Sequence, residues 1–167
     1  RIAGFRAGWM VISGPKVHAE DYIEGLNMLS SMRLCANVPC QHAIQTALGG
    51  YQSINELIMG DGRLLKQRNL AAKMINDIDR LSCHPAMGAL YLFVKVDQEK
   101  FSINNDEQMI LDLLKQEKIL LVHGSAFNIE EQNYFRLVFL PHVDELVPAL
   151  TRLKSFFESY KQVPAIK

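Results

Sequence analysis

The sequence predicts an α+β fold in which helices cover one side of a small, mostly antiparallel sheet. The coarse order of elements is a strand, then helices, then β-β-α-β-β-α. Four runs rich in β-favouring residues carry the second part of this order: residues 81–83, 89–96, 119–122 and 134–140, of which 89–96 is predicted to be a buried strand. Helices and strands with one apolar face bury each other by packing in layers, so this order favours a layered domain.

Composition excludes several classes of protein. Of the 167 residues, 49% are hydrophobic and 22% are charged, unlike a disordered, collagen-like or disulfide-dense chain. Lys and Arg number 18 together, as do Asp and Glu, so no net field favours nucleic acid or an anionic membrane. No apolar run approaches the roughly 18 residues that span a bilayer. The odd set of three cysteines suggests a reducing, cytoplasmic compartment.

The first part of the chain predicts one strand followed by two helices. Residues 9–13 are apolar and β-favouring, and a Gly-Pro turn signal ends them. Apolar residues at helical spacing predict a helix over about 16–34. Pro39 then suits the first turn of a second helix, which a Gly-Gly pair ends. Because strand-like sequence begins directly at Arg1, we expect a piece of a longer chain.

The rest of the chain predicts three helices among the four strands. A helix over about 63–78 follows a turn-rich stretch, and Asn105 or Asp106 can cap the next helix. The last helix carries an apolar stripe formed by Leu146, Leu150, Leu153, Phe156 and Phe157. The turn-rich stretch supports a domain boundary that separates residues 1–60 from residues 61–167.

The cysteines and histidines match no metal-binding pattern. Cys35, Cys40 and His42 lie close in sequence, and Cys83-His84 could complete a set. No C-x-x-C pair occurs, and the spacing fits no zinc site. We therefore expect ordinary thiols and no metal.

Other motifs of catalysis are missing. Ser125 follows a glycine, but the G-x-S-x-G nucleophile elbow does not occur, so Ser125 and the neighbouring His123 are interpreted as turn residues. The sequence also has no G-x-G-x-x-G motif and no P-loop. These absences remove the common nucleotide-binding and serine-hydrolase interpretations.

Two arginines point to ligand binding. Arg6 has a glycine two positions away on either side, which lets a backbone approach an anion that the guanidinium can fork onto. Arg136 lies in an otherwise apolar strand, and alternation puts it on one face with Tyr134 and Val138. A charge in such a strand needs solvent, a carboxylate partner or a ligand. An internal ion pair is therefore the alternative for each arginine.

Four segments, in order, resemble the class I aminotransferases, which use pyridoxal 5'-phosphate (PLP), and most closely the bacterial glutamate–pyruvate (alanine) aminotransferases. They are Ile2-x-Gly4-x-Arg6-Ala7-Gly8, Arg33-Leu34-Cys35-Ala36-Asn37-Val38-Pro39, Pro85-x-x-Gly88-Ala89-Leu90-Tyr91-Leu92-Phe93, and Gly124-Ser125-Ala126-Phe127 with Tyr134-Phe135-Arg136-Leu137. The first is similar to the second half of the family's PLP-attachment signature. The likeness departs at Asn128, where the family usually has glycine, and in the unusual loop 129–133.

The resemblance implies an α/β PLP-transferase fold and two assigned arginines. Residues 1–60 would be the C-terminal end of the large PLP-binding domain, and residues 61–167 the small C-terminal α+β domain. Arg6 would bind the phosphate of PLP, and Arg136 the substrate carboxylate. The lysine that carries PLP would lie three residues before Arg1, so no catalytic residue would fall within this chain.

The resemblance also implies substrates and an assembly. The substrates would be an amino acid, alanine or glutamate, and a 2-oxo acid, and the enzyme would be a homodimer with no nucleic-acid or membrane partner. Without the lysine, residues 1–167 alone would be inactive, and the strand over 9–13 would lack its sheet neighbours. The alternative is a free-standing, non-catalytic α+β binding module, which the sequence that precedes Arg1 would distinguish.

Overall fold

The chain divides into two compact units in a computed structural model that describes residues 3–163. The N-terminal unit comprises Arg1–Asn55 and the C-terminal unit Glu56–Lys167. Ile2 of the first family-like segment lies outside the described residues. The assignment of residues 1–60 and 61–167 to two enzyme domains stays a prediction.

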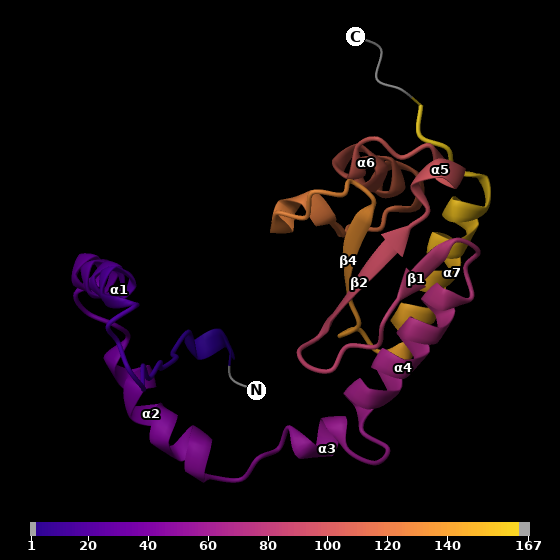
Figure 1. Cartoon of the computed structure of the whole chain (residues 1–167). Helices are drawn as coiled ribbons and strands as arrows, with labels where there is room; N and C mark the ends of the chain where they lie inside the picture. Colours follow the sequence, from indigo (N-terminus) through magenta and orange to yellow (C-terminus); the bar gives the residue numbers. More distant parts are fainter. Residues whose placement is uncertain (1–2, 164–167) are drawn as a thin grey trace. The chain divides into compact units, whose positions relative to one another are not determined.

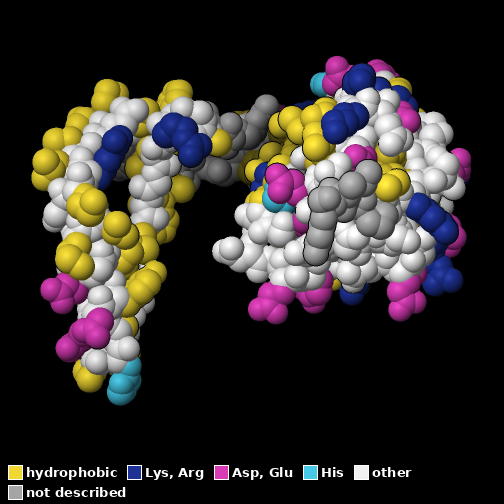
Figure 2. All heavy atoms as spheres, turned by 90° about the horizontal axis from the view of Figure 1, so that it is seen from above, with side chains coloured by type: hydrophobic (Ala, Val, Ile, Leu, Met, Phe, Trp, Pro, Cys, Tyr) yellow, Lys and Arg dark blue, Asp and Glu magenta, His cyan; other side chains and the backbone are white. Residues whose placement is uncertain are grey.

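The N-terminal unit consists of a short 3-10 helix, η1 (Ala3–Phe5), and two α-helices, α1 (Glu20–Arg33) and α2 (Val38–Gly49) (Figure 1). Both predicted helices are confirmed, and a proline in the first turn of α2 provides the predicted start. None of these three elements carries a buried residue. Hydrophobic side chains accordingly gather on the surface of this unit (Figure 2).

The strand predicted over residues 9–13 is wrong. The segment is irregular and exposed, with Trp9 at 66% and Val11 at 73% of full exposure. A β-strand exists only where a neighbouring strand accepts and donates its backbone hydrogen bonds. No strand pairs with residues 9–13 in the part of the chain that the structure describes.

The C-terminal unit holds all of the described strands and most of the described helices. After α3 (Asn55–Ile58), where one unit passes into the other, its elements are α4 (Arg63–Asn76), β1 (Leu81–Cys83), β2 (Tyr91–Val96), α5 (Gln98–Phe101), α6 (Asp106–Glu117), β3 (Val122–His123), the 3-10 helix η2 (Gly124–Phe127), β4 (Tyr134–Val138) and α7 (Val143–Ser159). Of the strand predicted over 119–122, only Val122 lies in a strand, β3, so this prediction is wrong for residues 119–121. Asn105 caps α6, because its side chain accepts a hydrogen bond from the backbone N–H of Gln108 at 2.9 Å.

The four strands form one antiparallel sheet in the order β1-β2-β4-β3 (Figure 1). Its register places Leu81 of β1 opposite Val96 of β2, and Phe93 of β2 opposite Arg136 of β4. The predicted α+β arrangement, with helices on a small antiparallel sheet, is confirmed.

The core lies between one face of this sheet and the helices α4, α6 and α7. Along β2, buried residues alternate with exposed ones, so Val94 is buried and Phe93 is open to solvent. The strand predicted over 89–96 forms as β2, but it is buried on one face only. The helices cover one side of the sheet, and a strand covered on one side alternates in burial.

Helix α7 is tied to α6 by a polar contact at the edge of the core. The hydroxyl of Tyr160, just after α7, donates a hydrogen bond to a carboxylate oxygen of Asp112 at 2.9 Å. Burial, and then this contact with Asp112, raise the pKa of Tyr160 well above its ordinary value. Among the described residues, none of the helices has the length and apolar character that crossing a bilayer requires.

Candidate functional site

Arg136 stands on the exposed face of the sheet. It lies in β4, and its partner across the β2–β4 ladder is Phe93. The residues that flank it in sequence are buried, whereas Arg136 itself is half-buried on the opposite face. The alternation that groups Arg136 with Tyr134 and Val138 is confirmed.

Two aromatic rings flank the guanidinium group of Arg136. Its Cζ atom lies 4.4 Å from the ring centroid of Tyr91 and 4.5 Å from that of Phe127. Phe127 in turn packs edge-on against Phe93, with 5.3 Å between the two ring centroids. Aromatic rings this close attract a guanidinium through their quadrupoles and by stacking. We call Tyr91 and Phe127 the aromatic pair.

The charge of Arg136 has no protein counter-ion in residues 3–163. No carboxylate lies within ion-pair distance of it, and its Nε atom is buried without a hydrogen-bond partner. The internal ion pair, which was the alternative from the sequence, is thus not formed by the described residues. A guanidinium that lies beside aromatic rings and has no ion partner can bind a two-oxygen anion by donating hydrogen bonds from its Nη atoms.

A buried carboxylate fixes the turn that carries Phe127. Asp106, the first residue of α6, is 1% exposed, and its carboxylate accepts two hydrogen bonds from Ser125 of η2. The backbone N–H donates at 2.8 Å and the hydroxyl at 2.7 Å. The Nδ1 atom of His123 lies 2.8 Å from the same hydroxyl oxygen.

These contacts differ from those of a serine nucleophile. The Ser125 hydroxyl donates its proton to the carboxylate of Asp106, and the Nδ1 atom of His123 lies beside the same hydroxyl oxygen. A catalytic serine instead gives its proton to a histidine, which the carboxylate orients. Ser125 and His123 therefore have the structural role in the turn that their sequence context suggests.

Arg6 is held by its own turn alone. It follows η1 with a φ of 53°, in the left-handed region, and its backbone N–H donates to the carbonyl oxygen of Ala3 at 3.1 Å. Its Nη1 atom donates to the same carbonyl, also at 3.1 Å, and Arg6 forms no ion pair with any described residue. A Cβ atom added at the nearby Gly4 or Gly8 would meet no atom within 4 Å, so the space around these glycines is open.

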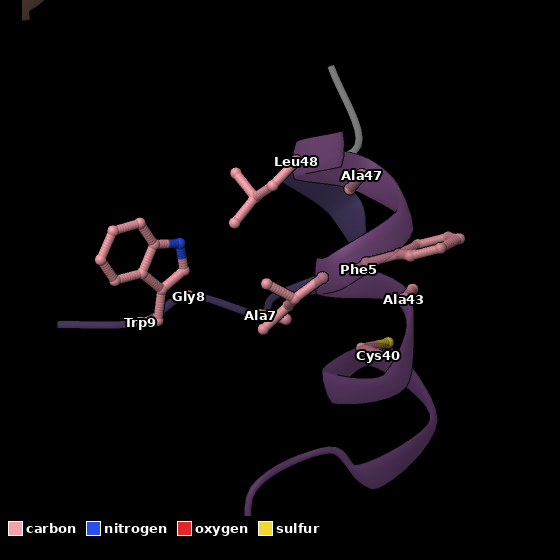
Figure 3. A pocket seen from close by; sticks show the side chains of 9 residues that line it. Phe5, Ala7, Gly8, Trp9, Cys40, Ala43, Ala47 and Leu48 are labelled. Carbon is pink, nitrogen blue, oxygen red and sulfur yellow. The ribbon is translucent and has the colours of Figure 1, made fainter. Parts of the chain in front are cut away.

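Two hollows adjoin this turn inside the N-terminal unit. One, of about 590 Å³, is lined by Arg6 and by the polar side chains of Asn37 and Gln41. The other, of about 320 Å³, is apolar, and Figure 3 shows Trp9 of the N-terminal segment beside Leu48 of α2 at its rim. Arg6 thus lines a hollow of mixed polar and apolar character.

The thiols are not grouped for metal binding. Within the described residues, no three His, Cys, Asp or Glu side chains are close enough to one another to hold an ion. Cys35 is exposed and Cys40 is half-buried, and both are free thiols. Burial raises the pKa of the Cys83 thiol, so it stays protonated and unreactive near neutral pH.

A family model described as aminotransferase class I and II matches residues 2–152. The chain belongs to this family. The family is PLP-dependent, and the resemblance seen in the four sequence segments is confirmed. The positions of Arg6 and Arg136 both fall within the matched range, although their individual roles stay predictions.

The similar proteins are aminotransferases, and this chain spans about 40% of their length. It is 59% identical over 162 residues to a glutamate-pyruvate aminotransferase of Haemophilus influenzae, covering 97% of this chain and 40% of that protein. It is 51% identical to an alanine aminotransferase of Mycobacterium tuberculosis, covering 97% and 38% of the two chains.

Solved aminotransferase structures have the same fold. A crystal structure of an aminotransferase from Escherichia coli is 58% identical, superposes with a TM-score of 0.88, and covers 98% of this chain and 40% of that one. Alanine aminotransferase from Pyrococcus furiosus is 32% identical, with a TM-score of 0.71 over 86% of this chain and 36% of that one.

Sequence reasoning identified Arg136 but not the residues that hold it. Tyr91 and Phe127 appeared in the family-like segments without a role, and Asp106 only as a possible helix cap. Their proximity to Arg136 or to Ser125 depends on the β2–β4 register and on the path of η2. The one signal in the sequence was the alternate spacing of Tyr91 and Phe93 in a predicted strand, and nothing comparable marks Phe127, which lies outside the strands.

Proposed function

We propose that this chain works within a longer, PLP-dependent aminotransferase that moves an amino group between an amino acid, alanine or glutamate, and a 2-oxo acid. The observation that carries the proposal is Arg136, an unpaired guanidinium on an exposed sheet face of an aminotransferase-family chain. The choice of alanine and glutamate rests on relatives that are 51% to 59% identical and are named for these reactions. Since the chain spans 40% of the first relative, the activity belongs to the longer protein.

Arg136 would bind the α-carboxylate of the substrate. Both substrates of a transaminase, the amino acid and the 2-oxo acid, carry this group, so one arginine serves both half-reactions. Two parallel N–H···O bonds from the Nη atoms fix the direction of the carboxylate and therefore that of the adjacent Cα. Holding Cα in one orientation lowers the entropy cost of removing its proton.

Arg6 would hold the phosphate of PLP. The residues present fit this group, because Arg6 is exposed, lacks a carboxylate partner among the described residues and lines a hollow together with the amide side chains of Asn37 and Gln41. When bound, PLP withdraws electrons from the substrate Cα, which makes its proton acidic. Arg6 would contribute only anchoring, since a guanidinium stays protonated and cannot shuttle that proton.

The assembly is also a proposal. We infer a cytoplasmic homodimer, with residues 1–60 as the end of the large domain and residues 61–167 as the small domain. The N-terminal unit exposes apolar side chains, among them Trp9, Met28, Leu29 and Met32. Such an exposed apolar surface supports its burial in the assembled enzyme.

The test is an assay of the full-length protein with PLP. It should convert alanine and 2-oxoglutarate to pyruvate and glutamate, and amino donor should change the absorbance of the bound cofactor. A full-length protein that folds but neither binds PLP nor transfers the amino group would refute the proposal. That result would favour the non-catalytic α+β binding module instead.

A further inference from the structure

The side chain of Arg136 is more restricted by its neighbours than a surface arginine needs to be. Its Cζ atom lies 4.4 Å and 4.5 Å from the ring centroids of the aromatic pair, Tyr91 and Phe127. The two rings come from different elements, β2 and η2, and neither is a sequence neighbour of Arg136. A long side chain without an ion partner would otherwise sample many rotamers and lose entropy when it binds a ligand.

The element that carries Phe127 is fixed at both ends. At its start, a Cβ atom on Gly124 would lie 2.6 Å from the Cβ atom of Tyr134, so η2 begins in direct contact with β4. One residue further, Ser125 donates two hydrogen bonds to the buried carboxylate of Asp106. At the end of η2, Asn128 has a φ of 58° and its N–H donates to the Ser125 carbonyl oxygen at 3.1 Å.

These contacts connect the start of α6 to the guanidinium in three steps. The carboxylate of Asp106 holds Ser125, Ser125 sets the position of η2, and η2 places the Phe127 ring beside Arg136. Bonds from N–H and O–H groups to a buried carboxylate are among the stronger hydrogen bonds in proteins. The turn is therefore held more firmly than its four residues would allow by themselves.

We propose that Tyr91 and Phe127 are positioning residues for Arg136, and that Asp106 and Ser125 act through Phe127. This inference rests on the proposed role of Arg136 as the carboxylate-binding arginine. The aromatic pair does for Arg136 what a carboxylate partner does for most buried arginines, which is to fix its direction. Unlike a carboxylate, the rings do not compete for the Nη atoms, so the positive charge remains available to the substrate.

The proposal predicts a specific kinetic signature. A positioned Arg136 binds the substrate carboxylate in the ground state as well as in the transition state and also orients Cα, so losing its support should raise KM by more than it lowers kcat. Phe127→Leu and Tyr91→Leu should each raise KM for alanine and 2-oxoglutarate about tenfold. Phe127→Tyr should restore the wild-type KM, because it keeps the ring.

A matched control lies on the same sheet face. The ring of Tyr134 lies under Lys95, with 5.5 Å between Nζ and the ring centroid. This ring is not one of the two that flank Arg136. Tyr134→Leu removes an aromatic–cation contact of the same kind from the strand that carries Arg136, and leucine keeps the Cβ atom that the start of η2 contacts. It should leave KM within about twofold of wild type.

The connection through Ser125 is tested by a double-mutant cycle. Ser125→Ala removes one hydrogen bond to Asp106 and should raise KM about threefold. In a Phe127→Leu background, the same substitution should have no further effect on KM, because its effect passes through the missing ring. An equal effect in both backgrounds would show that Ser125 does not act through Phe127.

Binding of a non-reactive ligand separates this inference from the proposed function. The probe is succinate, which has carboxylates but no amino or oxo group to transfer, titrated calorimetrically into the full-length PLP-loaded protein. The expected result is an affinity about tenfold weaker for Phe127→Leu and unchanged for Tyr134→Leu. Wild type that binds succinate but transfers no amino group would refute the proposed function and leave the aromatic pair supported. Phe127→Leu that keeps its melting temperature, its KM and its succinate affinity would overturn the inference.

Discussion

The two units of this chain carry one candidate arginine each, but they support it in different ways. In the C-terminal unit, Arg136 lies on a sheet with a buried core behind it and two rings beside it. In the N-terminal unit, Arg6 is held by one turn of its own backbone, and no α-helix of that unit carries a buried residue. One site is therefore organised by its own unit, whereas the other receives little support from the described residues of its unit.

The largest expected difference is in folding. The C-terminal unit, produced as residues 56–167, should unfold cooperatively with a free energy of about 5 kcal/mol or more, because its helices and sheet bury each other. Residues 1–55 produced alone should show no cooperative transition. Circular dichroism during urea titration measures both. A cooperative transition in residues 1–55 would break the comparison.

The next difference is in the effect of removing one aromatic side chain. Phe135→Ala should destabilise the chain by about 3–5 kcal/mol, because its ring is fully buried and stacks on Phe157 with 6.1 Å between centroids. Trp9→Ala should change stability by less than about 0.5 kcal/mol, because Trp9 is exposed. Equal shifts of the urea midpoint for the two variants would contradict a core confined to the C-terminal unit.

These units also differ in how well the sequence predicted them. In the C-terminal unit, local signals agree with tertiary packing, so β1, the cap at Asn105 and the stripe of α7 all appear where expected. In the N-terminal unit, residues 9–13 have strand-like composition but no strand partner among the described residues, and a strand cannot form from composition alone. Helices α1 and α2 form anyway, because helical hydrogen bonds are local.

The candidate site shows the same limit on prediction from sequence. Alternation along one strand was enough to place Arg136 on a face, because side-chain direction in a strand is a local property. The contacts of Arg136 with Tyr91 and Phe127 required the pairing of β2 with β4 and the turn of η2. The burial of β2 was mispredicted because its apolar residues run almost without interruption, which hides the alternation between its covered and its open face.

A third, smaller effect is the loss of PLP affinity when Arg6 is replaced. In the full-length enzyme, Arg6→Ala should weaken PLP affinity about tenfold to a hundredfold and change substrate discrimination little, because a charge-assisted phosphate contact is lost. Because alanine also has a Cβ atom, the substitution leaves the steric cost of the left-handed backbone at this position, with its φ of 53°, unchanged. Cofactor loss on dialysis, followed by absorbance, is the measurement. Unchanged retention of PLP would leave Arg6 without a role in binding the cofactor.

The smallest expected effect concerns pH. The pKa of Tyr160 is raised by burial and by its contact with Asp112, so the folded chain keeps the hydroxyl proton where the unfolded chain loses it. This contribution to stability is complete below about pH 10, the ordinary tyrosine value, and decreases as pH rises above it. Stability of the C-terminal unit should therefore fall in this alkaline range. Tyr160→Phe should reduce that fall, and an identical pH profile for the variant would refute the assignment.

The central claim is that Arg136 binds the substrate carboxylate, and kcat/KM of Arg136 variants in the full-length enzyme tests it most directly. Arg136→Ala should lower kcat/KM for alanine and 2-oxoglutarate by at least about 100-fold, because a bidentate charged contact is lost. Arg136→Lys should recover only part of this loss, since an ammonium cannot fork onto two oxygens. A folded, PLP-loaded Arg136→Ala enzyme that transaminates both substrates near the wild-type rate would contradict the claim.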